Sequence, residues 1–409
     1  MLQEQPTKRK LLFVAAATVI VGGVLAIVGS FGPVDLQVYR FGADAVLHGG
    51  DLYGQLPATT SGFPLPFIYP PFAAVVFTVM TLPPLAVSAV LMDLVSVAAL
   101  WVTLYATVRR LKPTWQAALP ATALTVAALA FEPVRSTLSF GQINLVLMAL
   151  VAVDILMPNP RWPRGIGVGI AAAIKVTPAG FLLFFLLTKD FRSARNALIA
   201  GAAATGLGFL VAPAASATYF FGGGLTGAAG LSGSPYATNQ TIEGALHRLN
   251  LPPLAYDVLW LGISAFVIAA AVVVMRRVDP PLAFVVNATA VLVLSPISWS
   301  HHWVWVAPAL VILAARVRTT RQGAALAAGT LVFIAAPHAF LPNSDMRELA
   351  WAPWQHVVGD SYLLFALGLL TWLLVVTQPA SVSLEEPALA AEACPRPTGR
   401  ISPLIEQNS

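Results

Sequence analysis

Long apolar runs separated by short polar segments fill the chain from residue 11 to residue 376. A helical run of about 17 or more mostly apolar residues is long enough to cross a bilayer. Helices are expected because each one satisfies its backbone hydrogen bonds internally. The pattern predicts an all-α integral membrane protein with about 12 transmembrane helices. They are drawn from the apolar runs 11–30, 67–82, 85–108, 116–132, 143–157, 165–175, 178–188, 196–213, 256–275, 281–297, 303–315, 323–341 and 360–376.

The run at 67–82 is expected to be a membrane-level or re-entrant helix in the first outer loop. If the other runs cross, 18 of the 23 Lys and Arg residues fall on one side of the membrane. The positive-inside rule makes that side cytoplasmic. We therefore expect a multi-pass protein of the plasma (inner) membrane with a cytoplasmic N-terminus. All six histidines and the longest loops, 31–72, 214–255 and 342–359, then lie outside, which predicts an extracytoplasmic active site.

The same pattern predicts one membrane domain, residues 1–376, and a short tail. Residues 377–409 are rich in Pro, Ala and Glu and are expected to form a disordered cytoplasmic tail. Within the domain, the runs 165–175 and 178–188 are each too short to cross a bilayer alone. Pro178 interrupts any continuous helix between them. They are interpreted as a broken hairpin with Lys175 at its tip.

Composition narrows the function classes. Apolar residues make up 57% of the chain and charged residues 10%, whereas about a quarter of a soluble domain is charged. The net charge of +5 is carried by clusters between apolar runs, so it indicates topology and not a nucleic-acid partner. No two acids are spaced as in Asp-x-Asp, and no P-loop is present, which argues against a Mg²⁺-held nucleotide-sugar site.

The first outer loop carries an acid at its beginning. Asp35 lies where a carboxylate can reach a lipid headgroup without being ionised inside hydrocarbon. This position fits a general base with a tuned proton affinity. It also fits an N-cap for a helix starting near Leu36, a role in which Asp is preferred. In the same loop, Tyr39, Arg40 and Tyr69 are candidate substrate contacts.

Two cations on the outer side are candidates for binding a phosphate. Lys175 lies between apolar half-helices, where a cation is costly without an anionic partner, although a lysine can also snorkel to the surface. Arg248 ends a short amphipathic helix predicted over 239–248 and suits bidentate phosphate contact. A solvated loop helix is the alternative for that segment. We predict that both cations bind the phosphate of a donor.

Polar residues at outer helix ends extend the candidate site. Gln142 and Asn144 follow a glycine where a helix enters the membrane, so they either bind sugar and phosphate oxygens or join helices through hydrogen bonds. Further candidate substrate-binding residues are Asn239, Gln240, Glu243, Ser298 and Trp299.

The segment 295–303, Ser-Pro-Ile-Ser-Trp-Ser-His-His-Trp, is the most unusual run of the chain. Its tryptophans are typical of an interfacial aromatic belt, but such a belt does not require two adjacent imidazoles. We predict that His301 and His302 contact phosphate or sugar. Adjacent histidines point in different directions and make a poor bidentate metal site, so we expect no metal and no cofactor.

In order and spacing, these motifs resemble those of glycosyltransferase family 87, polyprenyl-phosphate-dependent membrane mannosyltransferases of the GT-C superfamily. The likeness covers roughly residues 10–376. The resemblance implies a GT-C fold, Asp35 as the catalytic base, and a donor such as decaprenyl-phosphate-mannose. The motifs that carry it are Asp35 with Tyr39, Asp51-Leu52-Tyr53, Tyr69-Pro70-Pro71, Gly141-Gln142-Ile143-Asn144, Lys175 with Pro178, Asn239-Gln240, Arg248, and Ser295-Pro296-Ile297-Ser298-Trp299 with His301-His302.

The resemblance implies an inverting transfer of mannose to a phosphatidylinositol mannoside or lipomannan acceptor in α-1,2 linkage. The partners expected are a polyprenyl-phosphate-mannose donor, a glycolipid acceptor and the lipid bilayer. Two alternatives stay open. One is a GT-C arabinofuranosyltransferase that uses decaprenyl-phosphate-arabinose. The other is a transporter or flippase for a lipid-linked sugar, since broken helices with an intramembrane lysine also occur in transporters.

Overall fold

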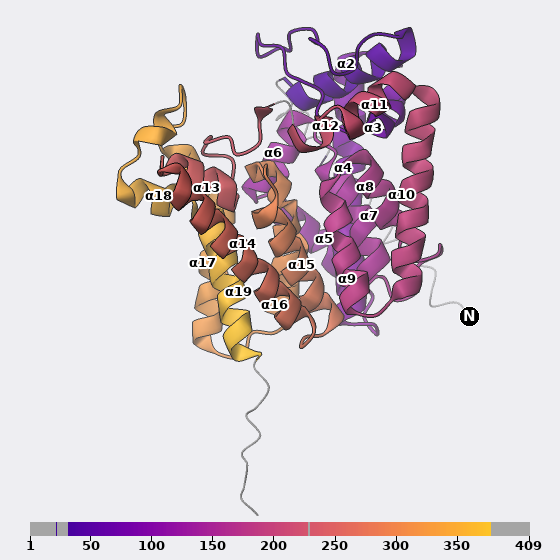
Figure 1. The fold of residues 1–409 in the computed structure, drawn as a ribbon. Helices are drawn as coiled ribbons and strands as arrows, with labels where there is room; N and C mark the ends of the chain where they lie inside the picture. The colour runs from indigo at the N-terminus through magenta and orange to yellow at the C-terminus, as the bar shows by residue number, and fades with distance from the viewer. Residues whose placement is uncertain (1–21, 23–31, 228–229, 378–409) are drawn as a thin grey trace, which may run out of the picture. The chain divides into compact units, whose positions relative to one another are not determined.

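The computed structural model describes residue 22 and residues 32–227 and 230–377 (Figure 1). Over these residues the chain is helical, and its only bridges between extended segments are the isolated pairs Ala58–Pro64 and Asn239–Trp299. The expected all-α class is confirmed. The predicted tail and almost all of the first apolar run lie outside the described residues.

Helices account for most of the described chain, and many of them begin at a proline, whose missing N–H costs nothing in the first turn. In chain order the elements are α2 (Val34–His48), α3 (Pro71–Phe77), η1 (Thr78–Met80), α4 (Leu85–Leu111), α5 (Ala118–Ala128), α6 (Glu132–Phe140), α7 (Asn144–Leu156), α8 (Ile166–Ile174), η2 (Thr177–Phe181), α9 (Leu182–Leu187), α10 (Phe191–Val211), α11 (Pro213–Phe221), α12 (Gly224–Gly227), α13 (Ile242–Arg248), α14 (Pro253–Met275), α15 (Pro280–Leu294), η4 (Ser300–Trp305), α16 (Val306–Ala314), α17 (Thr320–Ala335), η5 (Pro337–Phe340), η6 (Arg347–Ala350), α18 (Pro353–Gly359) and α19 (Ser361–Val376).

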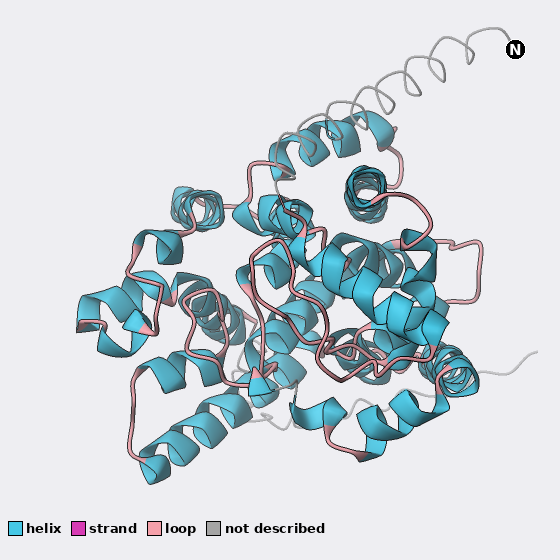
Figure 2. Ribbon diagram, turned by 90° about the horizontal axis from the view of Figure 1, so that it is seen from above, coloured by secondary structure: helices cyan, strands magenta, loops and turns pink. Residues whose placement is uncertain are grey.

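The helices pack in two groups. In the first, α10 packs along α8 and α4 packs along α7, while α2 packs on α3 at one end of the bundle (Figure 1). In the second, α14 packs against α15 and α19, and α16 packs against α17. Seen from above, several long helices are viewed nearly end-on, and loops cross over them (Figure 2). The helix α7 is buried on nearly every side, so it lies in the core.

Among the described helices, α4, α10 and α14 are individually long and apolar enough to cross a membrane. The pair α18 and α19 passes the same test together, with a bend of 73° between them. Six shorter apolar helices of 10 to 17 residues accompany them. The chain is thus a helical membrane protein, and the expected number of about 12 crossings stays a prediction.

The predicted break beside Lys175 is confirmed. The helix α8 ends at Ile174, Lys175 has an extended backbone, and η2 begins at Thr177. Pro178 explains the break, because its ring would clash with the carbonyl one turn earlier and it has no N–H to donate. The interruption turns the lysine side chain out of the helical register and into the interior of the bundle.

Candidate active site

The helix α2 carries Asp35 and Tyr39 one turn apart, so both side chains project from the same face. Its N-cap is Pro33, and no side chain caps the first turn. The alternative in which Asp35 caps a helix from near Leu36 is therefore wrong. Asp35 lies within the first turn, where a negative charge interacts favourably with the helix dipole. Tyr39 is fully buried beneath it.

A single amide side chain connects this helix to its neighbours. Gly141 ends α6 with φ of +66°, a conformation that glycine adopts without strain, and the turn delivers Gln142 to the buried face of α2. The Tyr39 hydroxyl donates to Gln142 Oε1 at 2.5 Å, and Gln142 Nε2 donates to the Tyr69 hydroxyl at 3.3 Å. Gln142 also hydrogen-bonds the Asp35 carboxyl. One amide thus holds the acid and two tyrosines together.

The surroundings of Asp35 adapt it to accept a proton near neutral pH. Burial raises the pKa of its carboxyl to about 6, and the Gln142 hydrogen bond and the positive charge of Lys175 limit the rise. A carboxyl with this pKa is mostly ionised at pH 7 and has a higher proton affinity than an exposed aspartate. Those are the properties of a general base.

Lys175 is held by neutral groups. Its Nζ donates to Asn144 Oδ1 at 3.0 Å and lies 2.9 Å from His302 Nε2, with the Tyr69 ring centroid 5.7 Å away. Within the part of the chain that the structure describes, no carboxylate oxygen lies within 4.0 Å of Nζ. An ammonium group has three N–H donors, so one remains for a ligand.

The two histidines of η4 are placed differently. His302 uses Nε2 to accept from Lys175, and its other ring nitrogen bonds the backbone of Ile297. The backbone oxygen of His301 accepts from Thr137 Oγ1 at 2.8 Å and from Asn144 Nδ2 at 3.0 Å. The buried Nε2 of His301 has no hydrogen-bond partner among the described residues.

A small cavity of about 30 Å³ opens beside this cluster. Its lining includes the polar residues Asn144, Lys175 and His302 and the aromatic residues Phe181 and Trp305. Polar and apolar side chains therefore meet beside Lys175.

A half-buried acid that was not predicted from the sequence orients the histidine segment. Glu132, at the start of α6, accepts from Ser300 Oγ at 2.8 Å and from the Tyr362 hydroxyl at 2.9 Å. Ser300 immediately precedes His301, so the acid fixes the point where η4 begins. Its sequence signal was an acid at the outer end of an apolar run, ten residues before Gln142.

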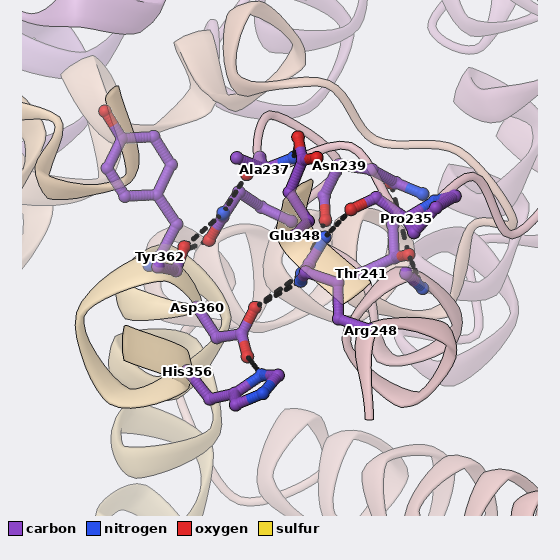
Figure 3. Close-up of polar contacts among 12 residues, drawn as sticks. Pro235, Ala237, Asn239, Thr241, Arg248, Glu348, His356, Asp360 and Tyr362 are labelled. Carbon is purple, nitrogen blue, oxygen red and sulfur yellow. Dashed lines mark hydrogen bonds and ion pairs between the residues drawn. The ribbon is translucent and has the colours of Figure 1, made fainter. Parts of the chain in front are cut away.

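Arg248 makes its contacts in a separate cluster (Figure 3). Its Nε and Nη2 donate to Asp360 Oδ1 at 3.0 and 2.5 Å, and its Nη1 donates to the backbone oxygens of Tyr236 and Pro235 at 2.8 and 3.3 Å. Nη2 also donates to the backbone oxygen of Asn239 at 3.0 Å. All five N–H donors of the guanidinium are therefore engaged, and the geometry favours an anchoring role over the predicted phosphate contact.

Asn239 and Gln240 are also engaged by neighbouring protein groups. Ser298 is engaged through its backbone, and its buried Oγ has no hydrogen-bond partner among the described residues. Asn239 Oδ1 accepts from the backbone N–H of Ser298 at 3.0 Å, and the backbone N–H of Gln240 donates to the backbone oxygen of Ser298 at 3.0 Å. Gln240 Nε2 donates to the backbone oxygens of Ala237 and Gly359, both at 2.7 Å. These bonds join residues 239 and 240 to the histidine segment.

Three further candidates lie apart from the Asp35 cluster. Arg40 donates to the backbone oxygens of Met80 and Pro83 and so fixes the connection into α4. Glu243 is half-buried next to His247 on α13. Trp299 is half-buried, with the Tyr236 ring 6.1 Å away. Their predicted substrate contacts stay predictions.

The structure thus gathers eight of the predicted site residues into one network and places the others outside it. The network joins five segments that are far apart in sequence: α2, the residues just before α3, the turn from α6 into α7, the break after α8, and η4. Its members are Asp35, Tyr39, Tyr69, Gln142, Asn144, Lys175, His301 and His302.

Comparison with known proteins gives a family match over the centre of the chain. The model of glycosyltransferase family 87 matches residues 67–296. A crystal structure of ArnT from Cupriavidus metallidurans bound to undecaprenyl phosphate aligns with a TM-score of 0.45 at 19% identity, over 88% of this chain and 77% of that one.

Characterised relatives extend the match over most of the chain. A polyprenol-phosphate-mannose-dependent alpha-(1-2)-phosphatidylinositol mannoside mannosyltransferase of Mycobacterium tuberculosis is 38% identical over 82% of this chain and 83% of its own length. The protein of the same description from Mycolicibacterium smegmatis is 37% identical, covering 82% of each chain. A phosphatidylinositol pentamannoside mannosyltransferase of Mycobacterium tuberculosis is 36% identical over 71% of this chain and 68% of its own.

Proposed function

We propose, from the premise that this chain belongs to glycosyltransferase family 87, that it moves mannose from polyprenyl-phosphate-mannose to a phosphatidylinositol mannoside or lipomannan acceptor in α-1,2 linkage. The observation that carries this proposal is the pairing of Asp35 with Lys175 in one buried network. A base and a cation with an unused donor are the two groups that direct transfer from a lipid phosphate requires. The relatives' described donor and acceptor agree with that chemistry.

The transfer takes place in one displacement. Asp35 accepts the proton of an acceptor hydroxyl as its oxygen attacks the anomeric carbon of mannose. The bond from that carbon to the phosphate oxygen breaks, and the polyprenyl phosphate leaves with the electron pair. Because attack and departure are on opposite faces, a β-linked donor gives an α-linked product.

The neighbouring side chains position these two groups. Gln142 holds the Asp35 side chain and is itself fixed by the Tyr39 hydroxyl, while Asn144 and His302 hold the Lys175 ammonium. Lys175 is placed to stabilise the charge that develops on the leaving phosphate. Fixed charges of this kind need no rearrangement during the reaction and usually supply a large part of the catalytic effect.

The proposal includes a GT-C fold with about 12 transmembrane helices and an active site on the extracytoplasmic face. The charge distribution of the sequence supports this orientation. Nucleotide sugars are not available on that side, and a lipid-linked donor removes the need for them.

A transfer assay tests the function. Purified protein in detergent is incubated with polyprenyl-phosphate carrying radiolabelled mannose and with phosphatidylinositol mannosides, and product linkage is determined. We expect label in an α-1,2-linked mannolipid. Transfer of arabinose from the matching arabinose donor, without transfer of mannose, would establish the arabinofuranosyltransferase instead. Movement of intact donor across a vesicle membrane, with no transfer, would establish a flippase.

A further inference from the structure

A larger cavity than the one beside Lys175 lies in the second helix group, and the two share no lining residue. It has a volume of about 380 Å³, within the range of roughly 300–1,000 Å³ typical of ligand pockets. Helices α16, α17 and α19 enclose it, at the end of the bundle where α19 stops (Figure 1). Its walls are apolar, and its polar lining residues are Arg316, Arg321 and Gln322.

Two glycines explain why the pocket exists. A Cβ on Gly329 of α17 would lie 2.3 Å from the Phe365 ring of α19, so the two helices are in close contact there. A Cβ on Gly368, about one turn further along α19, would meet no atom within 4 Å. The helices therefore separate between these two levels and leave a gap lined by Leu326, Leu369 and Trp372.

The arginines at the pocket differ in their partners. Arg316 is paired with Asp279 through two contacts of 2.5 and 2.7 Å. Arg321 is exposed, and its side chain has no hydrogen-bond or ion-pair partner within residues 32–227 and 230–377. It also lies in the first turn of α17, where the helix dipole disfavours a cation. An anion beside Arg321 would offset both effects.

We propose that this pocket binds an anionic phospholipid, with an acyl chain between α17 and α19 and the headgroup phosphate at Arg321. The apolar walls match the chain and the unpaired guanidinium matches the phosphate. Basic residues at a membrane surface attract anionic lipids by the same electrostatics. This lipid is neither donor nor acceptor, so the proposal stands independently of the transfer reaction.

Two variants separate the contributions of the chain and the headgroup. Gly368→Leu fills the gap at a position where the structure has room for a side chain. Arg321→Glu reverses the charge at the mouth of the pocket. Arg277→Glu is the matched control, because Arg277 is an exposed arginine that does not line the pocket. Retained mannosyl transfer in detergent shows that each variant is folded.

Native mass spectrometry of the purified protein with equimolar phosphatidylglycerol and phosphatidylcholine measures the retained lipid. We expect wild-type protein and Arg277→Glu to retain phosphatidylglycerol preferentially. Arg321→Glu should lower that retention by about fivefold or more, the effect of one cation near an anionic lipid, and Gly368→Leu should lower it comparably.

Equal retention by wild type and both variants would overturn the proposal. Loss in Gly368→Leu alone, with equal retention of the two lipids by wild type, would show an apolar groove without headgroup recognition. Displacement of phosphatidylglycerol by undecaprenyl phosphate at lower concentration would reassign the pocket to a polyprenyl lipid. Either result would also overturn the phospholipid assignment.

Discussion

Lys175 and Arg248 are both cations that the sequence predicts to bind phosphate, yet their surroundings differ in one decisive respect. Arg248 has its five donors engaged, two of them by the Asp360 carboxylate. Lys175 has two neutral partners and a donor left over. Breaking the contacts of a buried ion pair is costly, so Arg248 is poorly suited to release and rebind a substrate. The comparison teaches that the number of unused donors distinguishes a binding cation from an anchoring one.

Replacing Asp35, the proposed base, should have the largest effect on transfer. Asp35→Asn keeps the shape of the side chain but cannot accept a proton, and loss of a general base typically costs about 10²–10⁴-fold in rate.

Because burial raises the pKa of Asp35, its contribution to stability is fully present below about pH 4 and is lost as pH rises through about 6. At pH 7 the variant should therefore unfold at the same temperature as wild type or higher. Transfer rate and melting temperature measured together check this, and wild-type turnover in the variant would reject the base assignment.

Removing the positive charge of Lys175 should have the next largest effect on transfer. Lys175→Met preserves the apolar stem and deletes the charge, which should lower kcat by about 10²–10³-fold, as for loss of one group that stabilises developing charge. Single-turnover kinetics would isolate the chemical step. Asn144→Ala is the companion variant, since it leaves the charge in place but loses one hydrogen bond, and it should have a smaller effect. Unchanged kinetics in Lys175→Met would break the comparison.

The pH dependence of transfer should reveal the ionisation of Asp35. The base must be a carboxylate to act, and burial raises its pKa to about 6. The value of kcat/KM should therefore be half-maximal near pH 6 and fall about tenfold per unit below it. An acid limb near pH 4 would mean that an exposed carboxylate is the base.

The smallest effect on transfer is expected from replacing Arg248, whose N–H donors are all engaged by protein groups. Arg248→Met leaves Asp360 buried without its partner, so the variant should be less stable by about 3–5 kcal/mol. The molecules that remain folded should bind donor as wild type does. Thermal inactivation and donor affinity, measured on the same preparation, separate the two outcomes. Weaker donor binding with unchanged stability would instead support the phosphate contact that the sequence predicts.

Local chemistry made part of the site predictable from sequence. Asp35 was identifiable because it is an acid just beyond an apolar run, and Lys175 because a proline three residues later breaks a short apolar helix. The turn at Gly141 was visible as a glycine before two amide side chains. Each of these signals is contained within a few residues.

Long-range partners were not predictable in the same way. Asp360 lies 112 residues after Arg248, and Tyr362 lies 230 residues after Glu132. No local pattern predicts either pairing. An arginine with unused N–H donors therefore cannot be distinguished in a sequence from one whose donors are all engaged. The number of membrane crossings was equally elusive, because helices interrupted by proline are too short for length to decide whether they cross.

In the transfer proposed above, the electrostatic attraction between Asp35 and Lys175 affects the course of the reaction. At the start the ammonium faces a negatively charged carboxylate. When the acceptor's proton reaches that carboxyl, its charge disappears, and in the same step the departing phosphate becomes more negative. The ammonium therefore exchanges one counterion for another while staying in place, and the pocket tightens its hold on the leaving group only once the sugar has begun to move.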